Sequence, residues 1–102
     1  MIHAEISIYP MATPKTSASF YIAKAIESIQ DMEGIRYQIN PMGTVLESES
    51  IDKIYEASKS MSEVVHNLGV DRVEVILKID SRRDIDKSME EKLESVKKYL
   101  ES

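Results

Sequence analysis

Two acidic side chains, Glu47 and Glu49, have a spacing that suggests chemistry. They are two residues apart in an expected strand, so they lie on one side of it, about 7 Å apart. Paired carboxylates can hold a metal ion or carry out acid–base catalysis. Charged residues along a sheet edge also protect a protein against aggregation. We interpret Glu49 in this second way and leave both interpretations of Glu47 open.

Histidines, serines and glycines give weaker signals. His3 and His66 belong to different expected elements and have no metal-ligand spacing, so we predict no metal site. Ser17 and Ser19 lack the histidine–carboxylate pattern of a nucleophile, and helix capping is the stronger interpretation of Ser17. The chain has no cysteine, and its 3 glycines form no phosphate-binding loop. We therefore predict that the protein is not an enzyme and needs no cofactor.

Arg82 and Arg83 form a basic pair just before the last expected helix. They could hold a phosphate with the help of the helix dipole. They could equally form ion pairs with Asp80, Asp84 or Asp86, and we favour this interpretation because acids outnumber bases locally. A phosphate-handling enzyme that uses this pair is the third-ranked hypothesis.

Hydrophobic periodicity predicts the elements that position these residues. Residues 2–8 alternate between apolar and polar, as do residues 35–40 and 73–79, which is typical of half-buried strands. Another strand is expected from Thr44 to about Glu49, after a turn at residues 40–43 in which Gly43 would tolerate a positive φ. Helices are expected from a cap at Thr16 or Ser17 to about Met32, and from a cap at Ser50 to a stop at Gly69.

The order of these elements predicts a single domain over residues 1–102 of the α+β class. It is a ferredoxin-like βαββαβ sandwich, with a four-stranded antiparallel sheet, two helices on one face and an additional C-terminal helix. The apolar residues of that last helix, Met89, Leu93, Val96 and Leu100, form a narrow stripe of two per heptad. Such a stripe is expected to pack on the sheet or on another subunit.

Composition excludes several classes of partner. The formal net charge of −5 argues against binding to nucleic acid, which requires clustered Lys and Arg, and mildly favours cationic ligands. The apolar runs are far shorter than the roughly 20 residues that span a bilayer, so no membrane partner is expected. The first five residues lack the basic stretch of a secretory signal, and we expect a cytoplasmic protein.

Several segments together resemble the small thiamine-binding protein family. They are Ala4-Glu5 with Pro10, Ser17 to Tyr21, Tyr37 through Met42-Gly43-Thr44 with Glu47, Leu77 to Asp84, and Glu94-Ser95-Val96. The resemblance covers essentially the whole chain in order. Its most specific parts are Met42-Gly43-Thr44-x-x-Glu47 and Lys78-Ile79-Asp80-x-Arg82-Arg83-Asp84, with Ser81 where many relatives are expected to have aspartate.

The resemblance implies a ferredoxin-like homo-oligomer, a homotetramer built as a dimer of dimers. It implies non-catalytic binding of thiamine or its hydroxymethylpyrimidine moiety by Ser17, Ser19, Tyr37, Thr44 and Glu47. Glu47 could accept from the exocyclic amine, and Tyr37 could stack on a ring, although its strand parity places it with core residues. The alternative hypothesis is a regulatory or assembly module that acts only through protein contacts.

Overall fold

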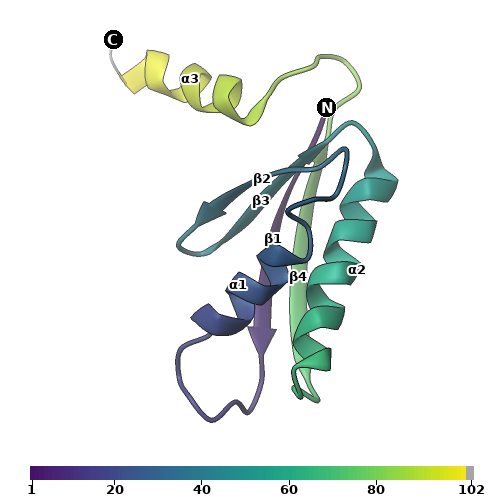
Figure 1. Ribbon diagram of the computed structural model, residues 1–102. Coiled ribbons are helices and arrows are strands. Elements are labelled where there is room, and N and C mark those ends of the chain that lie inside the picture. Colours follow the sequence, from purple (N-terminus) through teal and green to yellow (C-terminus); the bar gives the residue numbers. More distant parts are fainter. Residues whose placement is uncertain (101–102) are drawn as a thin grey trace.

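A computed structural model of the chain describes residues 1–100 (Figure 1). The strands are β1 (Ile2–Pro10), β2 (Arg36–Asn40), β3 (Gly43–Ser48) and β4 (Val73–Ser81). The helices are α1 (Ser19–Glu27), α2 (Ile51–Asn67) and α3 (Met89–Leu100). The predicted βαββαβ order with a closing helix is confirmed.

The four strands form one antiparallel sheet in the order β2-β3-β1-β4. β1 is central and pairs with β4 along its whole length, from Ile2 opposite Ser81 to Pro10 opposite Val73. α1 and α2 cover one face of the sheet (Figure 1), as right-handed crossovers require. The ferredoxin-like fold predicted from the sequence is therefore confirmed.

The core lies between that face and the two helices. The inward residues of β1, which are Ile2, Ala4, Ile6 and Ile8, are all buried, as the alternation predicted. They pack with Leu46 of β3 and with the buried stripes of the helices. The helix residues in this cluster are Ala25, Ile26, Ile54, Ala57, Met61 and Val65, and Ile29 joins it from the turn after α1. We call this face the helix face and the opposite one the open face.

The ends of α2 follow the prediction. Ser50 is the N-cap, and its hydroxyl accepts a hydrogen bond from the Lys53 backbone N–H at 3.4 Å. After the helix, Gly69 has φ +96°, a left-handed conformation that glycine adopts without steric cost.

The predicted ends of α1 and the role of Gly43 are wrong. α1 begins at Ser19 and has Ala18 at its cap, because the Ser17 hydroxyl accepts from the Ser19 N–H, at 3.3 Å, within a local turn. The helix ends at Glu27, and turns lead on to Gly34, where φ is +82°. Gly43 has no positive φ; it opens β3, where a Cβ would meet Ser7 Oγ at 3.1 Å.

α3 leaves the sheet near the N-terminus of the chain and extends away from the two-layer body (Figure 1). Its first residue, Met89, is buried, whereas Leu93, Val96 and Leu100 are exposed. None of the helices in residues 1–100 is long and apolar enough to cross a membrane.

Candidate ligand-binding site

A cavity of about 250 Å³ opens on the helix face, where the β2–β3 hairpin diverges from β1. Its lining comes from β1, the start of α1, the hairpin and α2. The lining residues are Ile6, Ser7, Ile8, Tyr9, Ala18, Ile22, Asn40, Pro41, Met42, Gly43, Thr44 and Met61. The walls are thus mainly apolar, with a few hydroxyl and amide groups, which is the usual make-up of a small-molecule site.

The cavity exists because β1 is longer than its pairing with β3. That pairing runs from Ile2 opposite Ser48 only to Ile6 opposite Thr44, so residues 7–10 have β4 as their only strand partner. The hairpin tip is still tied to β1, because the Ser7 hydroxyl donates to the Met42 carbonyl oxygen at 3.2 Å. The strand edge beyond Ile6 therefore faces the cavity instead of another strand.

Thr44 is the one predicted site residue among those that line this cavity. It is buried on the helix face, opposite Ile6 of β1. Ser17 and Ser19 flank the lining residue Ala18 and bond to each other, Oγ to Oγ, at 3.1 Å. Tyr37 shares the helix face, since it pairs with Leu46, and its hydroxyl accepts from Gln30 Nε2 at 3.3 Å. Thr44 and Tyr37 thus share the helix face and Ser17 and Ser19 adjoin the lining residue Ala18, but only Thr44 lines the cavity.

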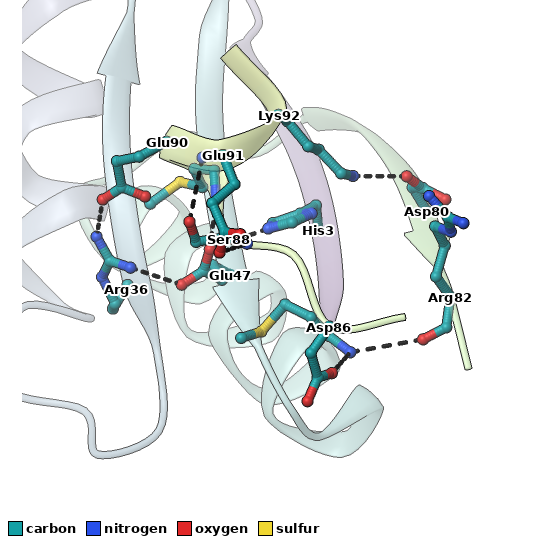
Figure 2. Close-up of polar contacts among 12 residues, drawn as sticks. His3, Arg36, Glu47, Asp80, Arg82, Asp86, Ser88, Glu90, Glu91 and Lys92 are labelled. Carbon is teal, nitrogen blue, oxygen red and sulfur yellow. Dashed lines mark hydrogen bonds and ion pairs between the residues drawn. The ribbon is translucent and has the colours of Figure 1, made fainter. Parts of the chain in front are cut away.

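Glu47 lies on the open face, three residues along β3 from Thr44 and on the other side of the sheet. It is only 4% exposed and accepts three hydrogen bonds (Figure 2). Its Oε1 accepts from Arg36 Nη1 at 2.8 Å, and its Oε2 from His3 Nε2 at 2.9 Å. The third donor is the backbone N–H of Met89, 2.7 Å from Oε2. Within one subunit, a small ligand cannot contact both Glu47 and Thr44.

The surroundings of Glu47 favour its ionised form. Burial alone would raise the pKa of the Glu47 carboxyl, but the hydrogen bonds from His3 and Met89 and the charge of Arg36 lower it further than burial raises it. The net result is a pKa below the usual value for glutamate. Glu47 is therefore a buried, charged acceptor that joins β1, β2 and α3.

Further ion pairs hold the first turn of α3 and the segment before it (Figure 2). Arg36 also pairs with Glu90, and Lys92 Nζ lies 2.6 Å from Asp80 Oδ2 on β4. The hydrogen bond from Lys92 lowers the pKa of Asp80. α3 is thus attached to the open face mainly through polar groups around Glu47.

The remaining chemical candidates are engaged in local structure. The Arg82 guanidinium pairs with Asp84, with Nε 3.0 Å and Nη2 2.5 Å from its two carboxylate oxygens, which confirms the ion-pair interpretation for Arg82. His66 Nδ1 donates to the Val70 carbonyl oxygen at 2.8 Å, at the end of α2. Within residues 1–100, no group of three or more His, Cys, Asp or Glu side chains could hold a metal ion.

Sequence reasoning missed most of the cavity lining. Ile22 and Met61 belong to the apolar stripes of α1 and α2, so their pattern indicated core and nothing more. A usable signal was present in β1, whose nine residues exceed the six of its neighbour β3. The contact between Glu47 and the Met89 backbone had no signal in the sequence, because any residue could supply that N–H.

Comparison with known proteins gives relatives along the whole chain. A UPF0045 protein of Methanothermobacter thermautotrophicus is 46% identical over 100 residues, which cover 98% of this chain and all of that protein. The crystal structure of a Methanocaldococcus jannaschii protein is 40% identical with a TM-score of 0.84, and the match covers 94% of this chain and 95% of that one. A Bacillus subtilis UPF0045 protein is 36% identical over 104 residues, 99% of each chain. Because the model of the family described as "Thiamine-binding protein" matches residues 4–97, this chain belongs to that family.

Proposed function

We propose that this protein binds thiamine or its hydroxymethylpyrimidine moiety without transforming it, in the cavity beside Thr44. The proposal is carried by one observation: a chain of the thiamine-binding family has a mainly apolar cavity at the open edge of its central strand. The volume of about 250 Å³ suits one flat heterocycle, with the rest of a larger ligand outside.

The chemistry of the cavity fits an aminopyrimidine. Apolar walls from Ile8, Ile22 and Met61 can pack on the ring faces. Residues 7–10 of β1 have no β3 partner, and an unpaired strand edge presents N–H and C=O groups in alternation. An aminopyrimidine edge also alternates donors and acceptors, so main-chain groups and the Thr44 hydroxyl can bind it. The thiazolium ring would lie outside the cavity, where the net charge of −5 attracts its positive charge.

The five predicted ligand residues have unequal roles in this proposal. Thr44 contacts the ring directly, and Ser17 and Ser19 lie beside the lining residue Ala18. Tyr37 lies on the same helix face but does not line the cavity, so it has no direct contact with the ring in this proposal. Glu47 would reach the ligand only if its bonds to other groups were broken, so we propose that it positions α3 instead.

Calorimetric titration with thiamine and with hydroxymethylpyrimidine tests the proposal. Thr44→Val keeps the shape of the side chain but removes its hydroxyl, and we expect it to weaken binding about tenfold, the effect of one lost hydrogen bond in a buried site. Thr16→Val, in the exposed loop, is the matched control and should bind like the natural protein. If neither compound binds the natural protein at millimolar concentration, the proposal is wrong.

The same titration decides between the two faces of the sheet. Glu47→Gln should leave the affinity within about threefold of the natural protein if the ligand occupies the helix face. A loss of binding in Glu47→Gln with normal binding in Thr44→Val would instead place the ligand on the open face. Circular dichroism of both variants must show the native spectrum before the affinities are compared.

We further propose that the protein is a cytoplasmic homotetramer, a dimer of dimers. Exposed apolar residues on α3 support an assembly, because Leu93, Val96 and Leu100 are costly to leave in water. The same observation favours the second candidate function, a module that acts only through protein contacts. An intact oligomer that binds neither compound would support that alternative. Sedimentation equilibrium gives the stoichiometry, and cell fractionation gives the location.

A further inference from the structure

The outer half of α3 carries an apolar stripe that the rest of residues 1–100 leaves largely exposed. Leu93 is 49% exposed, Val96 58% and Leu100 78%, whereas Met89 at the start of the helix is buried. These four residues are separated by four, three and four positions, the spacing of a two-helix seam. The first turn is attached to Glu47 through the Met89 backbone N–H, and the rest of the helix extends away from the two-layer body (Figure 1).

We propose that this stripe packs against α3 of a second copy of the chain, with the two helices antiparallel about a two-fold axis. The inference rests on the homo-oligomer of the proposed function and names the surface that forms it. In this register Leu93 packs beside Val96 of the second copy, and Leu100 beside Met89. An isologous pair of this kind uses the same patch twice, so the seam is its own complement.

The charges along α3 fix the antiparallel direction. The first turn carries Glu90 and Glu91, and the last turn carries Lys97 and Lys98. Glu90 and Lys97 flank the seam on the same side, where residues of two antiparallel helices face each other. Antiparallel pairing therefore places Glu90, which also binds Arg36, near Lys97 of the second copy. Parallel pairing would instead place Lys97 near Lys92 of the second copy, base against base.

A groove at the start of α3 fits the far end of the second helix. It has a volume of about 250 Å³ and is lined by residues that include Val45, Gln38, Met89 and Leu93. Because the proposed register sets Leu100 of the second copy opposite Met89, that leucine enters this groove. The groove is mostly apolar on the side of α3, so a leucine side chain suits it better than a charged residue.

Sedimentation velocity of the full chain tests the seam. Val96→Glu places a charge in the seam and should weaken the dimer at least tenfold. Lys98→Glu, on the outer side of the same helix, is the matched control and should leave the assembly unchanged. Circular dichroism establishes that both variants are folded. A Val96→Glu protein that assembles like the natural one, or a natural protein that is monomeric at micromolar concentration, would overturn the inference.

Oxidative cross-linking tests the direction, since the natural chain has no cysteine. In the double variant Leu93→Cys, Val96→Cys, the new thiol at position 93 of one copy faces the new thiol at position 96 of the other. The two thiols should form a disulfide and hence a covalent dimer. Leu100→Cys alone should not, because the two copies of residue 100 are 11 positions, about 16 Å, apart along the pair. Efficient cross-linking through residue 100 alone, or none in the double variant, would contradict antiparallel pairing.

These results can be separated from those on ligand binding. The cavity beside Thr44 lies on the helix face, whereas α3 attaches to the open face. A protein that forms the predicted cross-links but binds neither thiamine nor hydroxymethylpyrimidine would retain this inference and refute the proposed function.

Discussion

Replacement of Glu47 by glutamine should destabilise the protein by about 2 kcal/mol. The amide has one oxygen, which can still accept from His3 and from the Met89 N–H, while its NH₂ group then faces Arg36. The two retained bonds become neutral, and a hydrogen bond to a charged group is worth about 1 kcal/mol more than a neutral one. The Arg36 side chain is 56% exposed and can turn to water or to Glu90, so the loss of its bond to Glu47 adds little to the cost.

Urea denaturation followed by circular dichroism measures this effect at one fixed protein concentration. Glu49→Gln is the matched control, because Glu49 is an exposed carboxylate on the same segment of the chain. In a domain of this size, about 2 kcal/mol corresponds to a fall in Tm of roughly 8–16 °C. Hydrogen exchange should also become faster at the Met89 amide. A Glu47→Gln protein within about 0.5 kcal/mol of the control would refute the assigned role of the carboxylate.

Three further predictions concern stability. Because the pKa of Glu47 is lowered in the folded protein, its contribution to stability is fully present above the ordinary value of 4.5 and is lost as the pH falls through the lowered pKa. In denaturation series at decreasing pH, the difference in unfolding free energy between the natural protein and Glu47→Gln should therefore shrink. Leu46→Ala removes a fully buried side chain and should cost about 2–5 kcal/mol in urea denaturation, and a cost below about 1 kcal/mol would contradict its place in the core. Ser50→Ala removes the cap of α2 and should cost about 0.5–1 kcal/mol by the same measurement. This is the low end of the usual range for an N-cap, because the bond to the Lys53 N–H is 3.4 Å long. No change in stability would mean that the cap is not formed in solution.

The fold could be predicted because local patterns and the chain order agree. Alternation in residues 2–8 identified the buried side of β1, and the cap Ser50 and stop Gly69 bounded α2. The start of α1 could not be placed, because Ser17 can cap a helix or close a local turn with equal chemistry. The turn pattern predicts a positive φ at Gly43, whereas the structure explains the glycine by the close approach of Ser7. That approach depends on strands distant in sequence.

The candidate site was less predictable than the fold. The family resemblance predicts that Thr44 and Glu47 act together. Strand alternation, however, places residues three apart on opposite faces, so the alternation along β3 was sufficient to separate them. The partners of Glu47 could not be predicted, since they depend on where α3 meets the sheet. The cavity itself is a property of unequal strand lengths and of packing between elements, which no single segment encodes.

The central position of β1 has a consequence for how the chain folds. The first strand to be synthesised has its full-length partner near the other end of the chain, with Ile2 opposite Ser81. Local structure such as α2 and the β2–β3 hairpin can form early, but the sheet closes only after β4 is available. Contacts between such distant residues slow folding, because the intervening chain must first be ordered. During synthesis on the ribosome, β1 can pair with β3 along one edge, but its other edge therefore stays unpaired until β4 has emerged.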